Sequence, residues 1–171
     1  VAHEVLQHLD GRADLVIGSS SIIRAADSVP AVDHPPRVYA NRGVAGIDGT
    51  VATATGIALA DARPTTVLLG DLTVQHDLGA LVRPPLEPWP GLRVVVADDD
   101  GGSIFHTLEQ GAPEYADSFE RVFGTPQGLD LVAVAAAMGW DAVRVTTQAE
   151  LAAALEGDAD FIVAKVARPA P

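Results

Sequence analysis

The sequence contains no cysteine and only one lysine, Lys165. The lack of cysteine excludes disulfide bonds, a thiolate-ligated metal and a thiol nucleophile, and it fits a reducing compartment. The formal net charge of −12 at pH 7 argues against nucleic-acid binding, because a surface that follows phosphates needs clustered Lys and Arg. Any site for small anions must therefore use a few arginines and backbone N–H groups.

Long apolar runs are missing as well. No run approaches the roughly 20 residues of a membrane span, and the first residues lack the basic-then-apolar order of a signal peptide. We therefore expect no membrane span and take the cytoplasm as the compartment. The chain opens at Val1 rather than Met, directly into helix-like sequence, and we interpret it as a fragment or a processed piece of a longer protein.

Apolar residues make up 48% of the 171 residues, enough for a substantial core without disulfides or structural zinc. A chain of this length buries roughly 70% of its unfolded surface when it folds as one unit. We therefore expect residues 1–171 to form a single domain.

Short β-branched runs alternate with Ala-rich helical stretches, which predicts an α/β fold. The expected architecture is a doubly wound, mainly parallel sheet of six strands flanked by helices. The predicted strands are Asp14–Gly18, Arg37–Ala40, Thr65–Gly70, Arg93–Ala97, Asp141–Val145 and Phe161–Val166. The predicted helices are Ala2–Leu9, Ile47–Ala60, Gln75–Val82, Leu129–Met138 and Gln148–Leu155. In the last helix, Thr147 is the expected N-cap, and Glu150 three residues later completes a capping box.

Residues His106–Gly128 form a polar, proline-containing connection between the fourth strand and the next helix. A connection of this length in a compact domain is usually a functional loop or a mobile segment. A tolerated surface insertion is the alternative.

The carboxyl ends of the predicted strands narrow the search for a site, because ligands of doubly wound sheets bind beyond them. The segments that follow these ends are small, polar or charged. They are Gly18–Ser21, Asn41–Gly43, Gly70–Thr73 and Asp98–Gly102.

Two aspartates in these segments predict a cation site. Asp71 and Asp99 follow neighbouring strands, so both carboxylates are expected within reach of one hard cation with octahedral oxygen ligands. Gly101 and Gly102 would let a backbone carbonyl join them and a diphosphate approach closely. The alternative is that Asp71 only caps a helix and that the aspartate triplet is a turn.

Two arginines also lie shortly after predicted strands. In a chain this acidic, Arg24 and Arg42 are well placed to attract small carboxylates through bidentate hydrogen bonds. Each could instead be an ordinary solvated charge.

The order of these segments resembles the thiamine-diphosphate signature, which begins Gly-Asp-Gly and ends in a pair of asparagines. Here Leu72 replaces the third glycine and aspartates replace the asparagines. Longer strings resemble the MenD family of synthases, in which leucine after Gly-Asp is usual. The resembling strings are Tyr39–Gly49, Gly70–Thr73 with His76–Leu78, and Asp99–Phe105, within a similar stretch of roughly Leu15–Phe105.

The resemblance implies roles for individual residues. It makes Asp71, Asp99 and the Gly101 carbonyl the ligands of Mg²⁺ (or Mn²⁺), which anchors thiamine diphosphate. Ile47 resembles the apolar wedge beneath the bent cofactor, with a core position in the first helical turn as the alternative. The implied cofactor contacts are Ile47, Asp71, Leu72, Asp99, Gly101, Gly102 and Ser103. The implied substrate contacts are Ser20, Arg24, Asn41, Arg42, Ile104 and Phe105.

The resemblance further implies a transferase of menaquinone biosynthesis that decarboxylates 2-oxoglutarate and adds the remaining carbanion equivalent to isochorismate. It places the activating glutamate on a separate pyrimidine-binding domain, so no catalytic residue is expected in this chain, which should be inactive alone. A homo-oligomer is implied too, and the resemblance makes this chain the C-terminal part of a larger enzyme. Two alternatives stay open: another thiamine-diphosphate decarboxylase or ligase of the acetolactate-synthase kind, and a non-catalytic α/β interaction domain.

Overall fold

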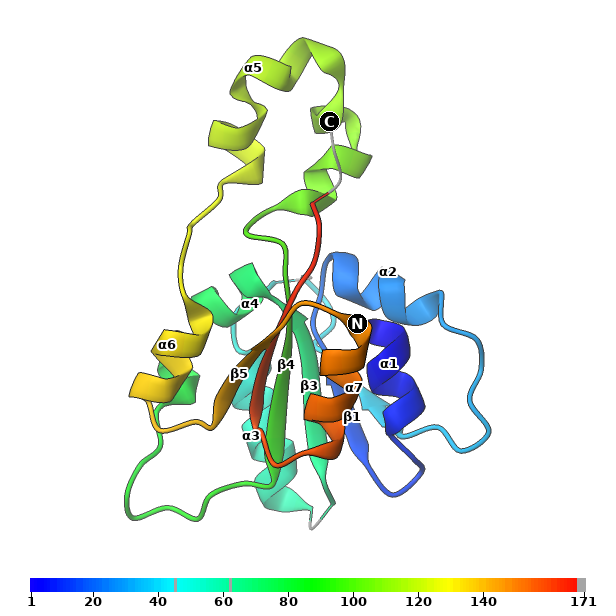
Figure 1. Ribbon diagram of the computed structural model, residues 1–171, viewed down its shortest axis with the longest axis vertical. Helices are drawn as coiled ribbons and strands as arrows, with labels where there is room; N and C mark the ends of the chain where they lie inside the picture. Colours follow the sequence, from blue (N-terminus) through cyan, green and yellow to red (C-terminus); the bar gives the residue numbers. More distant parts are fainter. Residues whose placement is uncertain (45, 62, 169–171) are drawn as a thin grey trace.

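The computed structural model describes residues 1–44, 46–61 and 63–168. Its centre is a six-stranded, all-parallel sheet in the order β2-β1-β3-β4-β6-β5, with helices on both faces (Figure 1). This confirms the predicted fold class. In the described ranges, no helix combines the length and the apolar composition needed to cross a membrane.

All six predicted strands are present, and their ends differ from the expected ones by one residue at most. They are β1 (Asp14–Ile17), β2 (Arg37–Tyr39), β3 (Thr65–Gly70), β4 (Leu92–Asp98), β5 (Ala142–Val145) and β6 (Phe161–Lys165). The α-helices that flank the sheet are α1 (Ala2–His8), α2 (Ser21–Asp27), α3 (Thr50–Ala60), α4 (Asp71–His76), α6 (Leu131–Ala137) and α7 (Gln148–Glu156).

The central strands of the sheet are buried on both faces, as their near-continuous apolar sequences require. In β4, Val94 and Val96 point to one face and Val95 to the other, and all three are fully buried. The first face packs against α3, α4 and α6, and the second against α1, α2 and α7. The predicted capping box of α7 is also present, since Thr147 and Glu150 bond reciprocally to each other's backbone N–H groups.

Two helix predictions were wrong in part, and one helix was missed. The helix expected at Gln75–Val82 is divided into α4 and a 3₁₀ turn, Leu78–Leu81. Asp77 separates them: its backbone leaves helical geometry, and its carboxylate accepts hydrogen bonds from the first amides of α3. Helix α3 begins at Thr50 rather than Ile47, after a left-handed Gly49 (φ 71°). Helix α2 was not predicted.

The polar connection after β4 is not an open loop. Residues 103–124 form a chain of short helical turns, here called the helical excursion, which stands beyond the carboxyl ends of the strands (Figure 1). Its turns are Ser103–Thr107, Glu109–Gly111, Pro113–Tyr115, α5 (Ala116–Phe119) and Glu120–Gly124.

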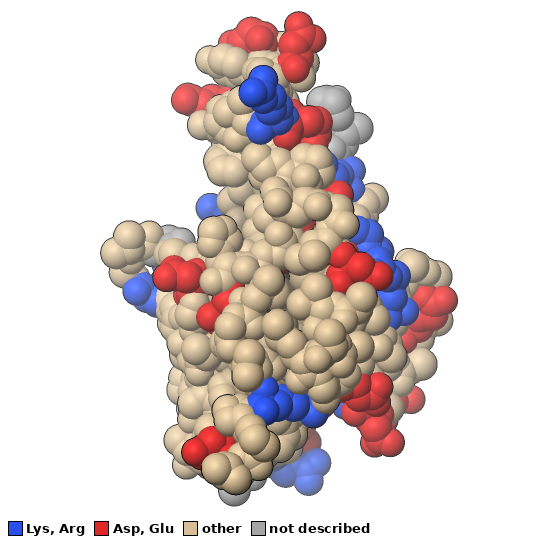
Figure 2. All heavy atoms as spheres, turned by 90° about the vertical axis from the view of Figure 1, so that its left-hand side faces the viewer, with Lys and Arg blue, Asp and Glu red and all other residues tan. Residues whose placement is uncertain are grey.

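The helical excursion has an aromatic core of its own. Phe119 stacks on His106 and packs near Phe123, with ring centroids 4.0 and 6.0 Å apart. Acidic side chains surround its outer end, as the space-filling view shows (Figure 2). After β6 the chain rises to this excursion, where Arg168 Nη1 contacts Glu120 Oε2 at 2.9 Å. These contacts make the excursion an ordered part of the fold.

Candidate functional site

A cavity of about 580 Å³ opens at the carboxyl ends of β1, β3 and β4. The strand order reverses between β1 and β3, and such a reversal opens a crevice in doubly wound sheets. All predicted site residues except Asn41 and Arg42 line this cavity. They are Ser20, Arg24, Ile47, Asp71, Leu72, Asp99, Gly101, Gly102, Ser103, Ile104 and Phe105.

Asn41 and Arg42 lie elsewhere because they follow β2, the edge strand of the sheet. Asn41 Nδ2 donates a hydrogen bond to Thr53 Oγ1 of α3 at 3.2 Å, and Arg42 is exposed. The sequence placed all strand ends at one edge but gave no strand order, so it could not separate these two residues from the rest.

The cavity has further lining residues that the sequence did not single out. Ser19 and Thr73 lie within the strand-end segments Gly18–Ser21 and Gly70–Thr73, next to residues for which the sequence predicts a role. Leu108 of the helical excursion and Val166 after β6 also line the cavity, and only the three-dimensional path of the chain brings them there.

Asp71 is the most unusual side chain of the cavity. Gly70 pairs with Ala97 across β3 and β4, so both strands release the chain at the same level and residues 98–101 come beside Asp71. Asp71 is only 3% exposed, and its Oδ2 accepts a hydrogen bond of 2.7 Å from the Gly101 N–H. Burial, followed by the negative charge of Asp99, raises the pKa of Asp71 to about 6. Within the described chain, no Lys, Arg or His pairs with it.

The three consecutive aspartates after β4 have three different environments. Asp98 is buried and pairs with Lys165 at 3.1 Å. Asp100 turns away and bonds to backbone N–H groups just beyond the helical excursion. Asp99 lines the cavity, and within the described residues its carboxylate accepts no hydrogen bond. Asp99 is therefore the member of the triplet that is available to a ligand.

The two glycines of this turn are required by a contact that the sequence did not reveal. A Cβ on Gly101 would lie 2.1 Å from the carbonyl oxygen of Gly124, and one on Gly102 would lie 2.4 Å from that of Phe123. Gly101 also has a φ of +139°, which side-chain-bearing residues rarely adopt. Close packing of the helical excursion thus accounts for both glycines, whether or not a diphosphate approaches them.

Ile47 and Arg24 take positions that differ from those expected. Ile47 precedes α3 instead of lying in its first turn, belongs to neither apolar core cluster and lines the cavity while half-buried. This placement excludes the alternative that Ile47 is a core residue of a helical turn. Arg24 lies on α2, where its Nη1 donates to the carbonyl oxygen of Ser20 at 2.9 Å. Ser20 itself has a positive φ of 77°.

The chemistry of the donor set fits a hard divalent cation. Asp71 and Asp99 are the acidic side chains of the lining in the part of the chain described, and carboxylate oxygens are preferred by such cations. Across the described ranges, no group of three or more His, Cys, Asp or Glu side chains could hold a metal ion. Other ligands, such as a backbone carbonyl, water or a phosphate, would therefore have to complete the coordination.

Comparison with protein families gives one match that covers most of the chain. Residues 17–163 match the model of the thiamine pyrophosphate enzyme, C-terminal TPP binding domain. This range contains both carboxylates and the whole turn that follows β4.

Several curated proteins with high similarity to this chain share the name 2-succinyl-5-enolpyruvyl-6-hydroxy-3-cyclohexene-1-carboxylate synthase. The protein of Paenarthrobacter aurescens (strain TC1) is 54% identical over 85% of this chain and 26% of its own length. That of Nocardioides sp. (strain ATCC BAA-499 / JS614) is 51% identical over 95% of this chain and 31% of its own length. The chain therefore spans roughly a quarter to a third of these relatives.

Solved structures share the fold at low sequence identity. Benzoylformate decarboxylase from Polynucleobacter necessarius superposes with a TM-score of 0.76 at 21% identity, over 99% of this chain and 33% of that one. A putative thiamin diphosphate-dependent enzyme from Mycobacterium smegmatis gives 0.71 at 22% identity, over 99% and 31%.

Proposed function

The chain belongs to the thiamine pyrophosphate enzymes, as their C-terminal TPP binding domain, and we propose that it is the diphosphate- and Mg²⁺-binding module of a synthase. The observation that carries this proposal is the buried carboxylate of Asp71. It faces a second acidic residue, Asp99, and has no cationic partner in the described chain. An external cation would remove this imbalance of charge.

We assign the cation to the carboxylates of Asp71 and Asp99 and to the Gly101 carbonyl, with Mg²⁺ or Mn²⁺ as the ion. Leu72, Gly102 and Ser103 would contact the cofactor around it, since they line the same cavity. Ile47 would support the cofactor from below, a role that fits its half-buried place outside both core clusters. When bound, thiamine diphosphate supplies the carbon nucleophile that allows a 2-oxo acid to lose carbon dioxide.

The substrates we propose are 2-oxoglutarate and isochorismate, by similarity to the synthases of about 50% identity. Arg24 is the cationic side chain of the cavity lining in the described part of the chain, and one of its N–H groups is held by Ser20. Its other N–H groups are available to a substrate carboxylate. Ile104 and Phe105 would exclude water beside the reacting carbons.

Asn41 and Arg42 stay in the proposal as substrate contacts, although they lie outside the cavity. They would act where the remaining parts of the enzyme close over the carboxyl edge of the sheet. Arg42 is exposed, so no contact inside the described chain competes with such a role.

The cavity is incomplete as a catalytic site. Within the described residues its lining contains two aspartates and no glutamate. We propose that a pyrimidine-binding domain outside this chain supplies the activating glutamate, in a cytoplasmic homo-oligomer, and that the chain alone is inactive. The chain's coverage of only 26–31% of its relatives leaves room for such a domain.

Calorimetric binding of thiamine diphosphate to the complete protein, with and without Mg²⁺, tests this proposal. We expect binding only with the cation, followed by turnover of 2-oxoglutarate with isochorismate. Binding accompanied by turnover of other 2-oxo acids would indicate a decarboxylase or ligase of the acetolactate-synthase kind. No binding under either condition would indicate a non-catalytic interaction domain.

A further inference from the structure

The turn that follows β4 is fixed on three sides. Asp98 Oδ1 pairs with Lys165 and accepts the N–H of Asp100 at 3.0 Å. The Gly101 N–H is bound to Asp71, and the Gly102 N–H donates to the carbonyl of Gly124 at 2.8 Å. Within the described residues, Asp99 is the member of this turn whose side chain accepts no hydrogen bond.

Asp100 connects this turn to the segment that follows the helical excursion in the chain. Its Oδ1 accepts two backbone hydrogen bonds, from Gln127 N–H at 3.0 Å and from Gly128 N–H at 2.8 Å. The residues on the two sides of the excursion are thereby joined through one carboxylate oxygen. No role for Asp100 is needed in the cavity itself, which it does not line.

The backbone of Asp100 is in a conformation that few residue types adopt. Its φ is +59°, in the left-handed region that few residues other than Gly, Asn and Asp adopt. Such a conformation persists where surrounding contacts over-determine it. The reversal at Asp100 lies between Asp99 and Gly101, so it decides where the Asp99 carboxylate and the Gly101 carbonyl point.

We infer that Asp100 is a positioning residue, which orients Asp99 and Gly101 for the cation by binding the amides of Gln127 and Gly128. This inference rests on the proposed function, because it assumes that the cation binds at Asp71, Asp99 and Gly101. Its consequence is that the segment just beyond the helical excursion, at Gln127 and Gly128, helps to set metal affinity without contacting the metal.

Three variants of the complete protein separate the tether from the backbone conformation. Asp100→Asn keeps the acceptor oxygen and tolerates the left-handed backbone. Asp100→Gly eases the backbone and removes the acceptor, and Asp100→Ala removes the acceptor while adding strain. Asp117→Asn is the matched control, because Asp117 is an exposed aspartate of the same excursion.

The first measurement is the Mg²⁺ concentration that gives half-maximal binding of thiamine diphosphate. We expect Asp100→Gly and Asp100→Ala to raise it about tenfold, since loss of a group that orients metal ligands costs roughly 10- to 100-fold in affinity. Asp100→Asn should stay within about threefold of the natural protein, and Asp117→Asn should be unchanged. The second measurement is amide hydrogen exchange without cofactor, in which Gln127 and Gly128 should exchange faster in the Gly and Ala variants only.

Faster exchange and a lower melting temperature with an unchanged Mg²⁺ midpoint would show a merely structural tether and overturn the inference. An unchanged exchange rate in Asp100→Gly would overturn it at its first step. Failure of the natural protein to bind cofactor with Mg²⁺ would instead overturn the proposed function, and the positioning role with it. The exchange arm needs no metal, so the two failures are distinguishable.

Discussion

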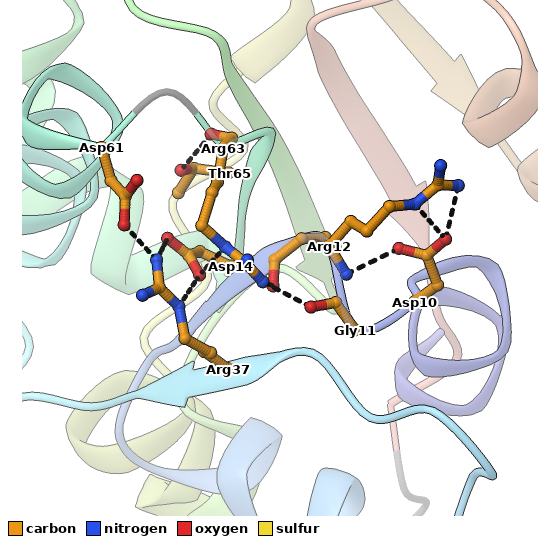
Figure 3. A network of polar contacts seen from close by, with 9 residues as sticks. Asp10, Gly11, Arg12, Asp14, Arg37, Asp61, Arg63 and Thr65 are labelled. Atoms are coloured by element: carbon orange, nitrogen blue, oxygen red, sulfur yellow. Dashed lines mark hydrogen bonds and ion pairs between the residues drawn. The ribbon is translucent and has the colours of Figure 1, made fainter.

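Two aspartates at opposite ends of the same sheet are both buried, but their surroundings differ. Asp14 begins β1 and is completely buried, and Arg37 and Arg63 surround its carboxylate (Figure 3). Arg37 donates Nε to Oδ1 at 2.8 Å and Nη2 to Oδ2 at 2.9 Å, and Arg63 Nε donates to Oδ1 at 3.0 Å. The Arg37 hydrogen bond, the largest influence, lowers the pKa of Asp14 despite its burial.

Asp71, at the carboxyl end of β3, has the reverse arrangement. It has no cationic partner in the part of the chain that is described, the charge that affects it most is that of Asp99, and its pKa is raised to about 6. A buried charge is costly unless it is paired. Asp14 at the amino end is thus paired with arginines of the chain itself, whereas Asp71 at the carboxyl end has no such partner among the described residues, which is the basis of the proposed cation site. Burial of an aspartate alone would not have distinguished the two ends.

The largest effect should come from removing the cationic partners of Asp14, so that it is left without such a partner, as Asp71 is within the described residues. Replacing both Arg37 and Arg63 with Met leaves Asp14 buried and unpaired, which costs on the order of 3–5 kcal/mol of unfolding free energy. Urea unfolding at pH 7 measures this. Arg12→Met is the control, since the Arg12–Asp10 pair is exposed and its loss should hardly change the free energy of unfolding. Equal losses in the two proteins would mean that the Asp14 network does not stabilise the fold.

Removing the charge at the other end should leave the fold intact and abolish cofactor retention. Asp71→Asn takes away a ligand, so Mg²⁺-dependent binding of thiamine diphosphate should weaken more than about 100-fold, beyond the usual effect of a group that only orients ligands. Calorimetry on the complete protein measures this, with circular dichroism to confirm the fold. Cofactor affinity equal to that of the natural protein would remove the basis of the metal assignment.

The pH dependence of stability should have opposite signs at the two ends. The folded-state pKa of Asp71, about 6, lies above the ordinary aspartate pKa of 3.8, so the folded protein binds the extra proton between these values. Its contribution to stability is therefore fully present below pH 3.8 and is lost as pH rises through 6. The loss is on the order of 3 kcal/mol, because the two pKa values differ by about 2.2 and one pKa unit corresponds to about 1.4 kcal/mol. The lowered pKa of Asp14 gives stability that is lost as pH falls below 3.8.

The free energy of unfolding of the natural protein and of Asp71→Asn, measured without Mg²⁺ between pH 4 and 7, checks the sign expected for Asp71. The free energy of unfolding of Asp71→Asn, relative to that of the natural protein, should increase with pH across this range. A constant difference would show that Asp71 titrates normally.

Arg24 extends the comparison, because it is a cation near the carboxyl end that does not pair with Asp71. Arg24→Ala should raise the KM for 2-oxoglutarate about tenfold through loss of a charge-assisted contact of roughly 1.5 kcal/mol. Cofactor affinity should hardly change. Arg121→Ala, an exposed arginine of the helical excursion, is the control in the same steady-state assay. Equal losses of cofactor and substrate affinity would place Arg24 at the diphosphate.

The smallest expected effect concerns the second carboxylate. Asp99→Asn lowers the negative charge of the empty site, so cofactor binding should depend on Mg²⁺ less steeply, with a change of about threefold in the midpoint. Below neutral pH, metal affinity should fall faster in the natural protein, because neighbouring carboxylates favour protonation. Titrations at two pH values measure this. Superimposable curves would mean that Asp99 does not contact the metal.

The sequence predicted the features that depend on local patterns. The apolar strands, the capping box at Thr147 and Glu150, and the strand-end segments all come from contacts within a few residues. Asp71 and Asp99 could be brought together because parallel neighbouring strands end at the same edge, and the pairing of Gly70 with Ala97 agrees with this.

The features that were missed depend on strand order and register. Asp14 and Arg63 are separated by 49 positions, and nothing local connects them. The position of β2 at the sheet edge removed Asn41 and Arg42 from the cavity. The polar composition of residues 106–128 hid the helical excursion, whose buried side is made by a few aromatic rings such as Phe119 and Phe123.

The position of β6 inside the sheet has a consequence for how the chain is made. Residues 161–165 leave the ribosome after the other five strands of this sheet, yet they pair with β4 on one side and with β5 on the other. Val94 must wait until Phe161, 67 positions later, has been synthesised before its side of β4 is covered. Until then the growing chain exposes a central strand edge, which favours association with other chains.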